Sequence, residues 1–101
     1  MNQYVPNLLY TVDAVLWVGS HRISGVLSIG EDAVTFRMEP DQQSHFSLYI
    51  PKNEIRRIEE FLVFGVSRNG LWIESQDGRE DRFVVEDPAE LKRMLSSWRR
   101  S

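Results

Sequence analysis

The chain has 101 residues, of which 42% are hydrophobic and 27% charged, so its composition is that of one ordinary globular domain. It contains no cysteine, which excludes disulfides, thiolate metal ligands and thiol catalysis and fits a reducing, cytoplasmic compartment. No stretch approaches the roughly 18 apolar residues of a membrane span, and the net charge of −3 disfavours a nucleic-acid partner. We therefore expect a soluble cytoplasmic domain that does not bind nucleic acid.

The first half of the chain alternates apolar and polar residues with the period of two that is typical of β-strands. Turns are predicted at Gly19 and Gly30, and Pro51 ends the last strand of this half. The predicted strands span residues 11–18, 22–29, 33–38 and 46–50, with a polar loop over 39–44. Residues 1–10 are expected to form an N-terminal arm, and residues 11–101 the domain.

The second half is less regular. Ile55 and Ile58 are three residues apart, which fits a short helical turn or a β-bulge better than simple alternation. Ser67-Arg68-Asn69-Gly70 predicts a hairpin turn, because Asn-Gly is favoured at such turns. Further strands are predicted on either side of a turn at Asp77-Gly78. The total is about seven strands.

A single helix is predicted after the last strand. Asp87 is its expected N-cap, Pro88 its first residue, and Glu90 the residue that closes a capping box. The apolar residues that follow have the spacing of one helical face, and they are Leu91, Met94, Leu95 and Trp98. We expect this stripe to dock on the sheet.

This order of elements resembles the pleckstrin-homology superfold, and in particular its GRAM-type branch. The residues that carry the resemblance are Gly25–Ile29 with Val34–Phe36, Ile50-Pro51 with Ile55 and Ile58, Gly70–Ile73, Asp77-Gly78, Phe83 and the helix from Asp87 to Leu95. The resemblance implies a mainly β fold, a seven-stranded antiparallel barrel capped by the C-terminal α-helix. Members of the family bind phosphoinositides, peptides or partner domains, and the fold does not choose among these ligands.

Catalytic and metal sites have little support in the sequence. The two histidines are His21, which follows Ser20 on a predicted turn where neighbouring side chains diverge, and His45, which stands alone. Paired carboxylates fall on predicted turns or strand edges and are interpreted as solvated acids, namely Glu31-Asp32, Glu59-Glu60 and Glu80-Asp81. We expect no catalytic residue, no metal and no cofactor.

The apolar run 61–64 carries the main functional hypothesis. Its four side chains cannot all enter one core if the other face of the strand is in water, so either the domain's own arm or helix covers them, or a second chain does. Trp17 and Trp72 are predicted on the strand face opposite the core. The candidate interaction surface therefore comprises Trp17, Phe61, Leu62, Val63, Phe64 and Trp72.

These patterns predict a non-catalytic binding or assembly module for a protein partner or for a homo-oligomer. The alternative is weak binding to a lipid headgroup or an anionic membrane surface. In the family that the sequence resembles, the lipid site is a cluster of Lys and Arg on the first two strands, and here that region offers Arg22 with His21 beside it. One basic residue contributes about 1 kcal/mol at an anionic membrane, which is too little to hold a domain there.

Overall fold

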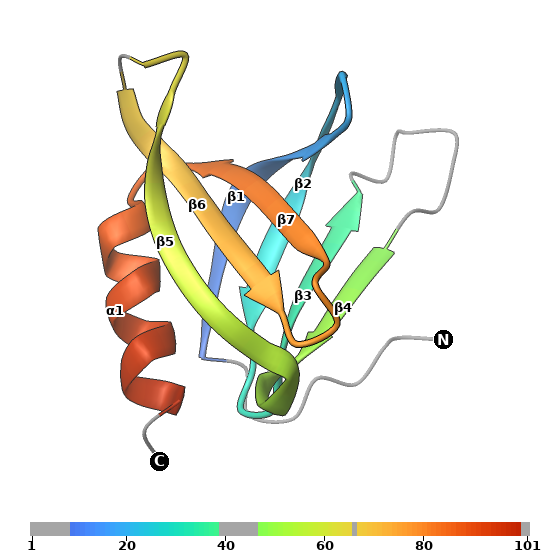
Figure 1. Cartoon of the computed structure of the whole chain (residues 1–101), viewed down its shortest axis with the longest axis vertical. Helices are drawn as coiled ribbons and strands as arrows, with labels where there is room; N and C mark the ends of the chain where they lie inside the picture. The colour runs from blue at the N-terminus through green and yellow to red at the C-terminus, as the bar shows by residue number, and fades with distance from the viewer. Residues whose placement is uncertain (1–8, 39–46, 66, 100–101) are drawn as a thin grey trace.

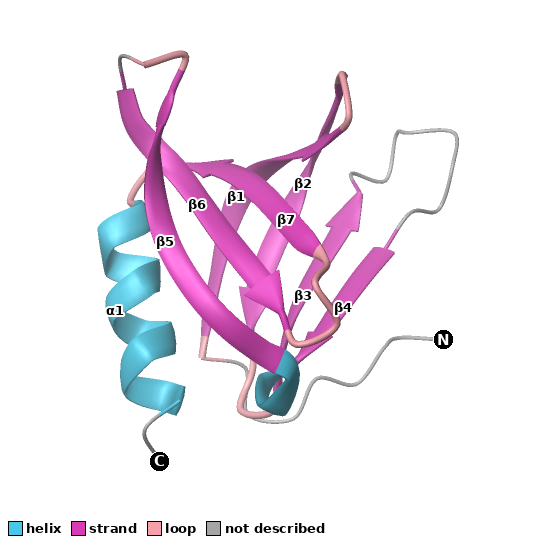
Figure 2. Ribbon diagram, viewed as in Figure 1, coloured by secondary structure: helices cyan, strands magenta, loops and turns pink. Residues whose placement is uncertain are grey.

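The structure is a computed structural model of the chain, and it describes residues 9–38, 47–65 and 67–99, without the side chains of 98 and 99. Seven strands and one C-terminal helix make it mainly β, as predicted (Figure 2). The strands are β1 (Tyr10–Val18), β2 (His21–Ile29), β3 (Ala33–Met38), β4 (Ser47–Pro51), β5 (Ile55–Val63), β6 (Ser67–Ser75) and β7 (Glu80–Val85). A 3₁₀ turn, η1 (Lys52–Glu54), precedes β5, and the helix α1 spans Pro88–Arg99.

The seven strands form one antiparallel sheet in the order β4-β3-β2-β1-β7-β6-β5. The pairing of β1 with β7 joins the first four strands to the last three, and the sheet curls so that β5, β6 and β7 lie in front of β1–β4 (Figure 1). β4 and β5 are the two edges, so the sheet is a half-barrel. The predicted arm is described only at Leu9 and Tyr10, and the loop over 39–44 and Phe46 lie outside the described residues.

The concave face of the sheet holds the core. Phe36 and Phe83 meet at its centre, with ring centroids 5.7 Å apart. The sheet can curl this tightly because residue 25 has no side chain: a Cβ at Gly25 would lie 2.2 Å from the carbonyl oxygen of Arg37. The buried cluster comprises Ala14, Leu16, Leu27, Ile29, Val34, Phe36, Ile50, Ile55, Ile58, Leu71, Ile73, Phe83, Val85, Leu91 and Leu95.

The helix begins as predicted, with the Asp87 carboxylate accepting a hydrogen bond of 3.1 Å from the backbone N–H of Glu90. The carboxylate of Glu90 pairs with Arg93 one turn later. Leu91 and Leu95 are buried and Met94 is half-buried, while the side chain of Trp98 lies outside the description. The helix packs against β5 and β6, so the apolar stripe docks on the sheet beside β5 (Figure 1).

The irregular spacing of Ile55 and Ile58 is explained by a β-bulge. The register of β5 against β6 shifts between Ile55 and Arg57, which places both isoleucines on the core side although they are three residues apart. A 3₁₀ turn lies directly before this bulge. Of the two alternatives left open by the sequence, the bulge is therefore the one that accounts for the pair.

The hairpin turn predicted at 67–70 is wrong, because these residues are the first four of β6. The chain turns earlier, where Phe64 and Gly65 both have positive φ angles, 54° and 71°. Gly70 instead makes room for a side chain from the neighbouring strand: a Cβ at this position would lie 2.6 Å from ring carbons of Phe61. The aromatic ring thus covers a glycine within the sheet.

Asn69 gives the second reason why the Asn-Gly pair does not turn. Its side-chain amide donates hydrogen bonds to the backbone carbonyls of Val85, at 3.2 Å, and Glu86, at 3.4 Å. These bonds tie β6 to the end of β7, just before the helix begins. Contacts across the sheet therefore outweigh the local preference of Asn-Gly for a turn.

Candidate interaction surface

The convex face of the sheet presents its side chains in rows, because residues paired in register on antiparallel strands point to the same face. One row crosses β2, β1, β7, β6 and β5 as Arg22, Trp17, Arg82, Trp72 and Glu59. The adjacent row consists of Ser24, Val15, Val84, Gly70 and Phe61. Both tryptophans therefore lie on the face opposite the core, as predicted.

Three aromatic rings and one guanidinium gather at the end of this face, and we call this cluster the aromatic cap: Trp17, Phe61, Phe64 and Arg22. The ring of Trp17 lies 6.0 Å from that of Phe61, edge to face, and 5.7 Å from that of Phe64. The guanidinium of Arg22 lies 5.5 Å from the Trp17 ring and 5.1 Å from the Phe64 ring. Both distances are within the range of cation–π attraction.

Phe64 is the most unusual residue of the cap. Its backbone has a φ of 54°, a region that costs an L-residue with a side chain about 1–2 kcal/mol. Its side chain is also 71% exposed, so the residue gains little from burial. A turn of this kind ordinarily carries glycine or asparagine. The position therefore keeps a large apolar side chain in water at an energetic cost.

The rest of the run 61–64 is split between environments. Phe61 and Val63 are half-buried, whereas Leu62 is 47% exposed. A second register shift, between Phe61 and Val63, interrupts β5 at this point. The helix α1 therefore does not cover Leu62 and Phe64. The N-terminal arm, the other segment expected to cover this run, lies outside the described residues before Leu9.

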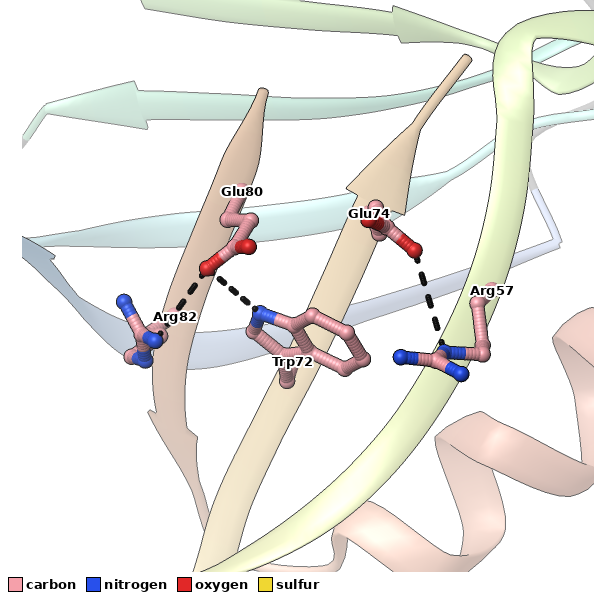
Figure 3. A network of polar contacts seen from close by, with 5 residues as sticks. All are labelled: Arg57, Trp72, Glu74, Glu80 and Arg82. Atoms are coloured by element: carbon pink, nitrogen blue, oxygen red, sulfur yellow. Dashed lines mark hydrogen bonds and ion pairs between the residues drawn. The ribbon is translucent and has the colours of Figure 1, made fainter. Parts of the chain in front are cut away.

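Trp72 lies apart from the cap in a polar network of its own (Figure 3). Its indole N–H donates to Glu80 Oε1 at 3.3 Å, and the same oxygen lies 3.2 Å from Nη2 of Arg82. The Arg57 guanidinium lies 5.0 Å from the Trp72 ring and its Nε 3.7 Å from Glu74 Oε1. Because its polar edge and its ring both have partners within the chain, we place Trp72 outside the candidate site.

The two residues proposed for lipid headgroups adjoin the cap. His21 and Arg22 are exposed at the start of β2, after a turn in which Gly19 has a φ of 61°. Together with Trp17, Ser20 and Phe64 they line a hollow of about 290 Å³. The candidate lipid residues and part of the candidate protein surface therefore form one site.

A second hollow, of about 430 Å³, lies on the same face, and we call it the acidic hollow. It is lined by Asp13, Ala14, Val15, Ser24, Gly25, Asn69, Val84, Val85 and Glu86. Asp13 and Glu86 are exposed, and neither carboxylate forms an ion pair within the described part of the chain. Sequence reasoning missed this hollow, because the pairing of β1 with β7 brings Asp13 and Glu86 together.

No protein-family model matches the sequence, and no curated protein matches it. Solved structures do match. The C-terminal domain of an unknown protein from Leishmania infantum superposes with a TM-score of 0.78 at 18% identity, over 94% of this chain and 85% of that one. The Vps36 N-terminal PH domain superposes with a TM-score of 0.61 at 11% identity, over 94% and 92%. The fold is pleckstrin-homology-like.

Within this pleckstrin-homology-like fold, one acid departs from its prediction. Asp81 was expected to be solvated but is buried, at 9% exposure, because it lies on the core side of β7. Burial raises the pKa of its carboxyl group, and the Arg79 guanidinium, 3.2 Å away, opposes that shift. Ser75 is also buried, and its hydroxyl has no hydrogen-bond partner among the residues that the structure describes.

The described residues contain no group of three or more side chains placed to hold a metal ion. His45, the second candidate histidine, lies outside those residues. No helix in the described part of the pleckstrin-homology-like fold is long and apolar enough to cross a membrane.

Proposed function

We propose that this pleckstrin-homology-like chain is a non-catalytic cytoplasmic binding domain, of the GRAM type, and that it holds a protein partner or a second copy of itself on the aromatic cap. The GRAM assignment is supported by the sequence pattern Gly25–Ile29, which forms the second half of β2, and by the hairpin that leads from it into Val34-Thr35-Phe36 on β3. The binding assignment is supported by the convex face.

Phe64 is the observation that carries the proposal. An exposed phenylalanine at positive φ is unfavourable both for the backbone and for the hydration of its ring. Strained residues persist in proteins mainly where function requires them. A large aromatic anchor surrounded by Trp17 and Arg22 has the composition of a binding hot spot, because tryptophan, tyrosine and arginine dominate such sites and a rigid ring loses little entropy on binding.

A photo-reactive benzoylphenylalanine at position 64, introduced in cells that naturally make the protein, tests the proposal. Tyr49 is the matched control, because it is an aromatic residue on β4 that is also exposed, at 59%. We expect irradiation to attach a protein chain at position 64 and none at position 49. Equal labelling at both positions, or no protein adduct at position 64, would contradict the proposal.

The second candidate is weak binding to a membrane surface. It is favoured by Arg22, a cation for which the described residues supply no carboxylate, and by the exposed apolar side chains of Val18 and Phe64 next to it. Vesicle sedimentation with and without anionic lipid tests this reading. Pelleting that requires anionic lipid, weakens with salt and disappears in Arg22→Glu would support it.

A further inference from the structure

We propose that the partner is a second copy of this chain, bound face to face about a twofold axis so that the aromatic cap of each copy fills the acidic hollow of the other. This inference rests on the proposed function and names the partner of the same surface. It follows from three properties of the convex face: the cap and the hollow lie side by side on it, Arg22 and the two acids carry opposite charges, and the cap has an exposed ring where the other end is hollow.

The cap and the hollow share one face because they use alternate residues of the same strand. Trp17 belongs to the cap, while Val15 and Asp13 line the hollow, and all three point to the convex side of β1. Successive residues of a strand advance about 3.3 Å, so Asp13 and Trp17 are roughly 13 Å apart along the strand. A partner that covers the cap therefore reaches the hollow as well.

The two ends of this face carry opposite charges. Arg22 provides the positive charge at the cap, where it stacks on two rings and presents its guanidinium to solvent. Asp13 and Glu86 provide the negative charge at the hollow. Two cations lie near this row: Arg37 on β3, which Val26 separates from Asp13, and Arg68 on β6, two residues before the Gly70 that pairs with Val84. Neither forms an ion pair with Asp13 or Glu86 within the described residues. Each end is thus complementary to the opposite end of another copy.

One end of the face carries an exposed ring and the other end is hollow. Phe64 is 71% exposed on the turn after β5, and the lining of the hollow of about 430 Å³ includes the apolar side chains of Val15 and Val84. A twofold axis that lies in the plane of the interface, between cap and hollow and across the line that joins them, places Phe64 of one copy opposite the hollow of the other and repeats the contact in reverse. Burial of two exposed phenylalanines then adds apolar area to two pairs of charge contacts.

Other occupants satisfy only part of this surface. An anionic membrane would be attracted by Arg22 but repelled by Asp13 and Glu86 on the same face. A purely basic segment would fit the acidic hollow and be repelled by the guanidinium of the cap. A second copy presents the complement of both ends at once, with the same apolar strip between them.

Sedimentation equilibrium of charge-swapped variants tests the proposal. Arg22→Glu and the double variant Asp13→Lys/Glu86→Lys each place like charges opposite one another in a homodimer, so we expect each to dimerise about 10- to 100-fold more weakly than the wild type. A heterodimer formed in an equimolar mixture of the two variants has two contacts between a cap and a hollow. One contact keeps both wild-type charges, and the other has both charges reversed, so both are attractive. We therefore expect the mixture to form a heterodimer with nearly wild-type affinity.

A control with the same change in charge is Asp32→Lys/Glu60→Lys, which alters two exposed acids outside the cap and the hollow and should leave dimerisation unchanged. Circular dichroism of every variant checks that the fold is retained. The inference is overturned if the wild type stays monomeric at millimolar concentration, if the charge-swapped variants dimerise like the wild type, or if their mixture does not associate.

The photo-crosslinking experiment separates failure of this inference from failure of the proposed function. If position 64 attaches to a different protein and the wild type is monomeric, the chain is a binding domain but not for itself. If position 64 attaches to no protein, the proposed function fails together with the inference. An adduct between two copies of the chain, lost in Asp13→Lys/Glu86→Lys, supports both.

Discussion

Two substitutions of Phe64 separate the strain of its backbone from the contacts of its ring. Both Phe64→Ala and Phe64→Asn remove the ring from Trp17 and Arg22, a loss of about 1 to 2.5 kcal/mol for one aromatic pair and one exposed cation–π contact. Asparagine tolerates positive φ, so Phe64→Asn recovers about 1 kcal/mol of the backbone penalty that Phe64→Ala keeps. We expect the asparagine variant to be more stable than the alanine variant by about that amount.

Urea unfolding followed by far-ultraviolet circular dichroism measures this difference, since both variants should have the same slope against urea. The asparagine variant is also expected to be less stable than the wild type by only about 0 to 1.5 kcal/mol while losing association, because the ring is what binds the partner. Equal stability of the two variants would refute the argument from strain. An asparagine variant that associates like the wild type would refute the role of the ring.

Three further substitutions test the fold. Gly25→Ala is expected to destabilise the domain by about 1–3 kcal/mol or more in urea unfolding, because its Cβ would meet backbone atoms of β3, whereas Ser24→Ala on the opposite face should be nearly neutral. Asp81→Asn is expected to raise the stability of the fold at neutral pH. The pKa of Asp81 is raised in the folded protein, so the stability that its carboxyl group contributes is greatest below the unfolded pKa of about 3.9 and is lost as pH rises through the folded value. The difference in thermal midpoint between variant and wild type should therefore shrink toward pH 3. Asp87→Ala should cost about 1 kcal/mol in thermal unfolding through loss of the helix N-cap, and an unchanged midpoint would show that the cap is dispensable.

Short-range patterns in the sequence were sufficient for most of the secondary structure. Alternation with a period of two defines β1, β2 and β3 nearly to the residue, since each buries one face and exposes the other. Asp87 and Pro88 mark the start of α1 because capping is a contact between residues three apart. These features depend on contacts between residues that are close together along the chain, so they can be predicted from the sequence alone.

The turn after β5 shows where local patterns fail. Asn69-Gly70 has the preferred sequence of a hairpin turn, yet the chain turns at Phe64-Gly65, which does not. The ring of Phe61 lies over Gly70, and the side-chain amide of Asn69 donates hydrogen bonds to backbone carbonyls at the end of β7. Both interactions form only after the strands have paired, so no property of the segment itself could reveal them.

The sequence by itself determined that the chain is mainly β, that a capped helix follows the last strand, and that the run 61–64 has more apolar side chains than one strand face can bury. Only the tertiary structure decided which of those side chains stay in water, that Arg22 stacks on Trp17 and Phe64, and that the acidic hollow forms beside them. For the acidic hollow, the reason is the pairing of β1 with β7. It brings together residues from opposite ends of the chain, whose contacts leave no periodic trace in the sequence.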